Sequence, residues 1–356
     1  MLKTKNRKVW YIRMKAIMKV APGPGNVELR DIPDVECKDN EVKINVKYSG
    51  ICGTDLHILH DTFKNFPPVV LGHEFAGIVI ETGKEVNSFN VGDRVTVLPS
   101  TAITCGTCEY CKQGQYVFCE TRRGMGYGVN GSFTKNVVVR EDMAYKIPDY
   151  ISLEAAALAE PLACVVQALE ELETPNAGDT VLLSGPGPLG LVSLSLLISR
   201  GVNVIVAGTD VDDIRLELSQ KMGASKVVNV SKENLSDIVK DLTNEKGVDF
   251  AVECAGHPSS INACLQQLKN KGKLVQLGIV GSEVTLDYDL VIYKQITLQG
   301  SVAHSMSTWE KVMKLFEQNT LDLNSLITHK FPLERWKEAF EMSENKQAGK
   351  VLLYHE

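Results

Sequence analysis

The sequence lacks long apolar runs and an excess of positive charge. No uninterrupted apolar run reaches the roughly 18 residues that a membrane span needs, so we expect no membrane partner. The first 13 residues carry five cations but no apolar stretch, which argues against a secretory signal and favours a cytoplasmic protein. The formal net charge is −6, whereas a nucleic-acid surface needs a basic face. We therefore expect neither membrane nor nucleic-acid binding.

A disulfide framework and internal repeats are also missing. The chain has nine cysteines, an odd number, in 356 residues. In a chain without an export signal, clustered cysteines are more typical of metal ligands than of disulfides. This length is enough for two domains, each with its own hydrophobic core.

The pattern of hydrophobic residues changes near residue 151. Residues 14 to about 150 contain short β-like runs separated by Gly and Pro, which predicts an irregular, mostly antiparallel β domain. After an Ala-rich helical stretch at 151–172, strands alternate with helices, as in a doubly wound parallel sheet. We assign 1–13 to an N-terminal tail, 14–160 with 300–356 to the β-rich domain, and 161–299 to an α/β domain of the Rossmann type.

Four cysteines lie close together on one hydrophilic segment, in the pattern C-x2-C-x2-C-x7-C. Four thiolates can complete a tetrahedral zinc shell with no position left for water, as in a structural site. Reduced thiols in a loop, or an iron–sulfur cluster, are the alternatives. The residues are Cys105, Cys108, Cys111 and Cys119.

A second set of possible ligands is spread over two segments. Cys52 lies in YSGICGTDLH, and His73 and Glu74 lie in LGHEFAG. Alone, a histidine beside a strand is more often a packed residue, and a lone cysteine is usually a small buried hydrophobe. A thiolate, an imidazole and a carboxylate together suit Zn²⁺.

A G-x-G-x-x-G turn follows the apolar strand TVLLS and precedes an apolar helix. In this context the glycines predict a dinucleotide site with the pyrophosphate at the helix N-terminus. Asp210 lies about 20 residues further on, where an acid binds the ribose hydroxyls and favours NAD over NADP. The strand is one residue longer than usual, so Gly208 or Thr209 can occupy part of this place. The turn residues are Gly185, Gly187, Pro188, Leu189 and Gly190.

From about Met14 onward, these motifs, with GDRV and the Glu160–Pro161 pair, resemble the zinc-containing medium-chain dehydrogenase family. The resemblance implies a GroES-like catalytic domain, a Rossmann domain, one catalytic and one structural zinc, NAD, and a homodimer or homotetramer. It implies that Cys52 and His73 bind the catalytic zinc and that Glu74 ligates it directly or exchanges with water.

Glu160 stands where classical alcohol dehydrogenases of this family have a second cysteine, a feature that resembles the sorbitol and threonine dehydrogenase branch. Cys164 is a competing ligand, because on a helix it lies on the same face as Glu160.

The resemblance also implies a proton path and further cofactor contacts. Thr54 would accept the proton of the substrate alcohol, and the ribose would pass it to His57; otherwise Thr54 or Asp55 caps a helix and His57 is a surface residue. Arg215 would stack on adenine, although a nearby arginine can also tolerate NADP. The segment Leu277, Gly278 and Ile279 would line the nicotinamide, or simply end a strand. The other histidines, His304 among them, are interpreted as structural or surface residues.

The expected function is a zinc-dependent oxidoreductase that interconverts a secondary alcohol, with a polyol as the expected substrate, and its ketone with NAD. Within the family, threonine or a simple alcohol is the alternative substrate. A zinc-free reductase of the same fold is disfavoured by residues 52, 73 and 160. The alternative from another class is a zinc-stapled binding module without catalysis.

Overall fold

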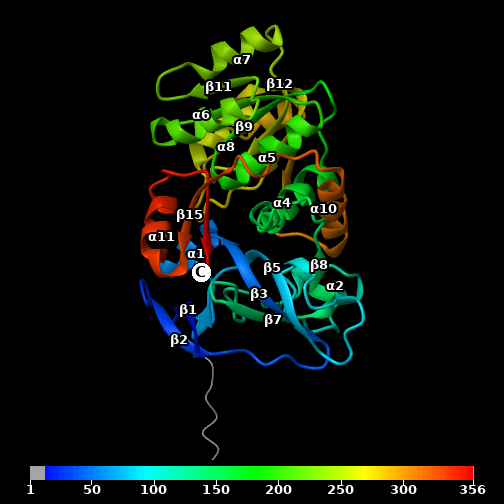
Figure 1. Cartoon of the computed structure of the whole chain (residues 1–356). Helices are drawn as coiled ribbons and strands as arrows, with labels where there is room; N and C mark the ends of the chain where they lie inside the picture. The colour runs from blue at the N-terminus through cyan, green and yellow to red at the C-terminus, as the bar shows by residue number, and fades with distance from the viewer. Residues whose placement is uncertain (1–12, 356) are drawn as a thin grey trace, which may run out of the picture.

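The computed structural model describes residues 13–355, which form two lobes that meet along a layer of helices (Figure 1). Residues 1–12 of the expected N-terminal tail lie outside the described residues, and the first strand begins at Arg13. No helix among residues 13–355 is long and apolar enough to cross a membrane.

The first lobe is built on a seven-stranded sheet with the order β15-β16-β3-β5-β6-β8, in which β7 also pairs with β3. All its pairings are antiparallel except that of β15 with β16, which confirms the predicted mostly antiparallel domain. A three-stranded sheet, β2-β1-β4, completes the lobe. The strands are β1 (Arg13–Lys19), β2 (Val27–Pro33), β3 (Glu41–Gly50), β4 (Val69–Val70), β5 (Glu74–Thr82), β6 (Arg94–Val97), β7 (Asn136–Arg140), β8 (Ala144–Lys146), β15 (Ile327–Pro332) and β16 (Lys350–Tyr354). The helices are α1 (Gly53–Leu59), α2 (Glu109–Lys112) and α11 (Trp336–Glu344).

The second lobe is a six-stranded sheet with the order β11-β10-β9-β12-β13-β14, and every neighbouring pair is parallel. This is the doubly wound order of dinucleotide-binding folds. Val181 and Leu183 of β9 pack into one hydrophobic cluster and Leu182 into another, so both faces of the sheet are covered. The elements are β9 (Thr180–Ser184), β10 (Asn203–Gly208), β11 (Lys226–Asn229), β12 (Val248–Glu253), β13 (Leu268–Gln276), β14 (Thr297–Gly300), α5 (Pro188–Ser199), α6 (Asp213–Lys221), α7 (Leu235–Thr243), α8 (Pro258–Gln267) and α9 (Asp289–Tyr293).

The layer between the lobes contains α4 (Ala159–Val166) and α10 (Met306–Gln318), which lie side by side in Figure 1. The helical stretch expected at 151–172 is divided into three successive elements, α3 (Leu153–Ala156), α4 and a π-helical turn (Gln167–Leu172). Proline is tolerated only in the first turn of a helix, where its missing N–H has no intrahelical partner. The restart at Ala159 puts Pro161 in that first turn and brings Glu160 to the start of α4.

Candidate active site and cofactor-binding edge

The first group of possible metal ligands lies where β3 and β5 pair. Their register places Gly50 opposite Glu74, so Cys52, just after β3, comes close to His73, just before β5. One ligand atom from each of Cys52, His73 and Glu74 lies within 4.8 Å of the others, and His73 and Glu74 are buried. The antiparallel pairing thus brings together the three residues predicted from two separate segments.

A second group lies on α4 and on the loop before α10. Ligand atoms of Glu160, Cys164 and His304 are also within 4.8 Å of one another. Cys164 Sγ is 3.8 Å from Glu160 Oε1, which confirms that both residues lie on one face of the helix. The interpretation of His304 as a possible surface residue is wrong, because its side chain is buried against Glu160.

The two groups lie close enough for the charges of one to shift the pKa values of the other. Burial raises the pKa of Cys164 well above its usual range, and the charges of Glu160, Cys52 and Glu74 raise it further. Burial alone would also raise the pKa of Glu160, but the hydrogen bond from His304 and the nearby His73 outweigh burial and lower it. These shifts favour Glu160 over Cys164 as the ionised ligand at this point of the site.

Two ionisable residues, Asp55 and Lys350, contact the first group of possible ligands. Asp55 accepts hydrogen bonds from the Cys52 and Gly72 amides at 2.9 and 3.2 Å, and its Oδ1 is 3.8 Å from His73 Nδ1. The buried Lys350 on β16 pairs with Glu74 and donates to the Ile51 carbonyl at 2.9 Å.

Lys350 was not predicted from the sequence, where the only signal is one lysine at the start of the apolar run KVLLY. The lack of a side chain at Gly50 makes the contact between Lys350 and Glu74 possible. A Cβ at position 50 would lie 2.2 Å from Glu74 Oε2 and 2.8 Å from Lys350 Cε.

The chemistry of these residues fits the zinc that the resemblance implies. Thiolate, imidazole and carboxylate donors are its usual ligands, and a catalytic site has three of them with one position left open. The buried His73 Nδ1 has no hydrogen-bond partner within residues 13–355. Such an atom is costly to bury unless a ligand satisfies it. Cys52, His73 and Glu160 are the residues that would hold the metal, with Glu74 beside them.

The four cysteines of the 105–119 segment converge around α2. Their sulfur atoms lie within 4.8 Å of one another, and Cys105 Sγ is 3.9 Å from Cys111 Sγ. Tetrahedral zinc with Zn–S bonds of 2.3 Å needs sulfurs about 3.8 Å apart. All nine cysteines are free of disulfides. Amides of Thr107 and Cys108 donate to Cys105 Sγ at 3.5 and 3.2 Å and lower the pKa of this thiol to about 5. The lobe therefore fits a closed, structural zinc site.

Cys108→Ser is expected to remove the structural zinc only. Zinc content should fall from two ions per chain to one, and the thermal midpoint should fall by several degrees because a closed site contributes folding free energy. Elemental analysis and calorimetry measure both effects. The matched control is Cys37→Ser, since Cys37 is a free, half-buried cysteine on another loop. Two ions retained by Cys108→Ser would contradict the assignment.

The residues of the predicted proton path lie on α1. Thr54 is half-buried on its first turn, and His57 is exposed with Nδ1 2.9 Å from Thr62 Oγ1. The N-terminus of α1 is capped by Asp55, which accepts from the Cys52 amide, so capping does not require Thr54. The path from Thr54 to His57 stays a prediction.

The glycine turn has the shape that a pyrophosphate site needs. Gly185 has φ +95° and a Cβ there would lie 2.6 Å from the Ala255 amide nitrogen. A Cβ on Gly190 would lie 2.1 Å from the Gly185 carbonyl, so helix and strand approach closely. A Cβ on Gly187 would meet no atom within 4 Å beyond its chain neighbours, and α5 begins at Pro188, followed by Leu189. The first amides of α5 therefore border open space, as phosphate binding requires.

Asp210 follows β10 and lies on the surface at the predicted ribose position. Its Oδ1 accepts from Asn229 Nδ2 at 3.0 Å and is 3.3 Å from Lys232 Nζ. β10 ends at Gly208, and Thr209 is the N-cap of the 3₁₀ turn that follows.

Arg215 is 6% exposed, and its Nε donates to the Ala348 carbonyl at 2.7 Å. Its Nη1 is 3.6 Å from Asp212 Oδ1. Stacking on adenine needs an exposed guanidinium face, so this placement favours a role in joining the two lobes over the predicted adenine contact.

The segment 277–279 is held by Glu253, at the end of β12. The Leu277 and Gly278 amides donate to the Glu253 carbonyl at 2.8 and 3.0 Å, and Ile279 is 75% exposed. The buried Glu253 carboxylate accepts from the Ala255 and Gly256 amides at 2.9 and 3.0 Å. Ala255 packs against the turn at Gly185, so Glu253 connects this turn to the segment 277–279. It was missed from the sequence, where its signal is an acid that ends the apolar strand DFAVE.

Asp210→Gly is expected to shift cofactor preference toward NADP. The substitution removes a carboxylate that repels a 2′-phosphate and leaves Lys232 with one anionic partner fewer, so that it can also pair with the phosphate. A charge-assisted hydrogen bond contributes about 1.5–3 kcal/mol, so the ratio of kcat/KM for NADP to that for NAD should rise roughly tenfold or more. Asp213→Asn is the control, since Asp213 also pairs with Lys232 but lies on α6. An unchanged ratio would place the ribose acid elsewhere.

Comparison with known proteins agrees with this geometry. Residues 38–149 match the model of the alcohol dehydrogenase GroES-like domain, and residues 188–318 match that of the zinc-binding dehydrogenases. The chain is 37% identical over 342 residues to D-arabitol-phosphate dehydrogenase of Enterococcus avium, covering 96% of this chain and 97% of that protein. It is 38% identical over 345 residues to L-threonine 3-dehydrogenase of Shewanella putrefaciens, covering 96% and 99%. A zinc-binding dehydrogenase structure from Sinorhizobium meliloti bound to NADP superposes with a TM-score of 0.87 at 29% identity, covering 96% and 99%.

The fold and the two ligand sets define an enzyme of the zinc-dependent, dinucleotide-linked dehydrogenase class. The chain belongs to the zinc-containing medium-chain dehydrogenase family, in the branch that includes polyol and threonine dehydrogenases. A zinc-stapled module without catalysis is thereby excluded.

Proposed function

We propose that this enzyme oxidises a secondary hydroxyl of a polyol to the ketone, and reduces the ketone, with NAD as the preferred hydride carrier. The observation that carries the proposal is the position of Glu160, whose Oε1 lies 3.3 Å from His304 Nε2 and whose pKa is lowered, against the effect of burial, by this hydrogen bond and then by the charge of His73. A site with one thiolate and a carboxylate leaves the metal a harder Lewis acid than a site with two thiolates. Such a metal suits a substrate with neighbouring oxygen atoms.

Some residues of the chain would bind the metal and the cofactor, and others would transfer the proton. The bound zinc would polarise the substrate hydroxyl so that it loses its proton near neutral pH. Cys52, His73 and Glu160 would hold the metal, Glu74 would complete its carboxylate surroundings, and Thr54 would receive the proton. Asp210 would accept from the ribose hydroxyls of the cofactor, which supports NAD over NADP.

A cationic cluster supports a phosphorylated polyol as the substrate. Arg123 lies 4.1 Å and Lys64 5.6 Å from the centre of the Phe66 ring, and both cations are exposed. Arg122 Nη1 donates to the Tyr127 hydroxyl at 3.1 Å. The 121–131 loop packs against Gly72, beside His73, because a Cβ on Gly126 would lie 2.8 Å from the Gly72 carbonyl. The similarity to D-arabitol-phosphate dehydrogenase points to the same substrate class.

The test compares D-arabitol, a D-arabitol phosphate, L-threonine and ethanol as substrates with NAD. We expect the highest kcat/KM for the polyol phosphate. Arg123→Met should raise its KM roughly tenfold, the worth of one charge-assisted hydrogen bond, and leave free arabitol unaffected. Lys84→Met is the control, since the side chain of Lys84 is 89% exposed on another loop. Preference for ethanol would overturn the polyol proposal, and equal loss for both arabitols would overturn the phosphate contact.

We further propose a cytoplasmic homo-oligomer. The nine free cysteines suit a reducing compartment. Strand β14 forms one edge of the six-stranded sheet, and apolar side chains near it are exposed, among them Ile292, Tyr293 and Leu298 at 62, 81 and 41%. An exposed edge strand with apolar neighbours is a natural place for a second copy to pair.

A further inference from the structure

The buried His304 has a contact on each ring nitrogen. Trp309 Nε1 donates to His304 Nδ1 at 2.8 Å, and His304 Nε2 lies 3.3 Å from Glu160 Oε1. His304 is 2% exposed and Trp309 is fully buried. Trp309 also stacks on Tyr145 with ring centres 5.2 Å apart, so the indole has little freedom to turn.

These contacts determine the tautomer of His304. An indole N–H can only donate, so His304 Nδ1 must accept and carries no proton. The single N–H of a neutral imidazole is then on Nε2, where it points to the Glu160 carboxylate. His304 is thus a hydrogen-bond donor to Glu160 at Oε1.

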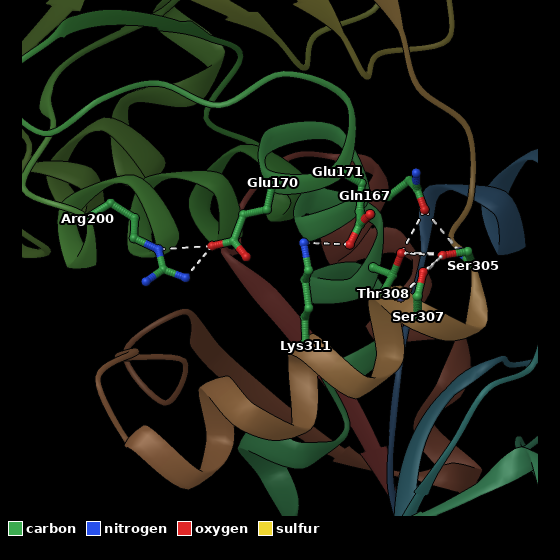
Figure 2. A network of polar contacts seen from close by, with 8 residues as sticks. All are labelled: Gln167, Glu170, Glu171, Arg200, Ser305, Ser307, Thr308 and Lys311. Carbon is green, nitrogen blue, oxygen red and sulfur yellow. Dashed lines mark hydrogen bonds and ion pairs between the residues drawn. The ribbon is translucent and has the colours of Figure 1, made fainter.

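A network of polar contacts holds the two elements in this arrangement (Figure 2). Gln167, directly after α4, accepts from the Ser305 amide at 3.1 Å and from the Thr308 hydroxyl at 2.7 Å. One turn further along α10, Lys311 pairs with Glu171 at 2.7 Å. The loop that carries His304 and the helix that carries Glu160 are therefore fixed to each other independently of the metal.

We propose that His304 is a positioning residue that fixes the Glu160 carboxylate for metal binding. This inference rests on the assignment of Glu160 as a ligand. The N–H of His304 points to Oε1, which restricts the rotation of the Glu160 carboxylate and would leave its other oxygen available to a metal. Outer residues that orient a metal ligand typically change metal affinity by about 10- to 100-fold. His304 itself stays outside the ligand shell, because its Nε2 lone pair is protonated.

The experiment measures metal binding, separately from turnover. In His304→Phe the ring is kept and the donor is lost, so zinc release from the catalytic site to a chelator should be about 10- to 100-fold faster. The structural zinc should be retained, and the visible spectrum of the Co²⁺-substituted enzyme should shift. His304→Gln, whose amide can donate, should recover part of the affinity. His60→Phe is the control, because His60 forms a similar pair with Glu344 on the surface.

Trp309→Phe provides a second test if His304→Phe does not fold. It keeps His304 but removes the donor that sets its tautomer, so zinc release should accelerate in the same direction to a smaller extent. Unchanged zinc release and an unchanged Co²⁺ spectrum in either folded variant would overturn the proposal. A Co²⁺ spectrum of His304→Phe with one ligand fewer, not recovered by glutamine, would instead make His304 a direct ligand. None of these readouts depends on which alcohol is the substrate.

Discussion

Cys52→Ser is expected to abolish turnover while the fold remains intact. Cys52 is the thiolate of the catalytic set, and a serine hydroxyl is a much poorer zinc ligand. A bound metal contributes several kcal/mol to transition-state stabilisation, and each 1.36 kcal/mol is a factor of ten, so kcat should fall by about 10³ or more. Steady-state kinetics, elemental analysis and circular dichroism measure activity, zinc content and fold.

The zinc content of this variant separates the two metal sites. One ion should remain, held by Cys105, Cys108, Cys111 and Cys119, whose contacts do not involve Cys52. Cys37→Ser again serves as the control and should keep full activity. Full activity of Cys52→Ser would show that the catalytic ligands have been misassigned.

Glu160→Gln is expected to lower kcat by roughly 10², with the structural zinc untouched. The amide keeps the shape of the side chain but removes a negative charge from a buried site, where electrostatic interactions are strong. It also brings an NH₂ group toward a pocket in which His304 already donates to Oε1. The measurements are kcat for the preferred polyol and the zinc content of the purified variant.

Cys164→Ser is the matched comparison, since Cys164 lies on the same face of α4. Burial and three neighbouring negative groups keep its pKa well above the usual range, so its thiol is neutral and its loss should change kcat little. If Glu160→Gln were neutral and Cys164→Ser inactive, the site would have two cysteine ligands. The polyol proposal would then lose its main support, and a simple alcohol would be the better substrate.

Local sequence patterns were enough for the fold and for the four-cysteine cluster. The alternation of strands and helices after residue 151 predicted the parallel sheet, because side-chain periodicity reflects which face of each element is buried. One of the short β-like runs expected between residues 14 and about 150 is β3, Glu41–Gly50. The C-x2-C-x2-C-x7-C and G-x-G-x-x-G spacings predicted their sites because each site is built from one short segment.

Other features depended on contacts between distant parts of the chain. Lys350 meets Glu74 across 276 positions, and His304 meets Glu160 across 144 positions. The packing of β16 and α10 determines these contacts. Residue spacing within a short segment does not predict that packing. Arg215 shows the same limit: its register predicted a cofactor contact, but the loop before β16 provides a carbonyl that buries its guanidinium.

The sequence by itself determined which residues can hold metal and dinucleotide, since ligand chemistry and turn geometry follow from residue type and short spacing. The tertiary structure alone decided which side chains support those residues. A buried charge or hydrogen-bonding group needs a partner, and in a folded chain that partner comes from whichever element packs against it. Glu160 lies on α4 by sequence, but it was the packing of α10 that placed the His304 donor beside it.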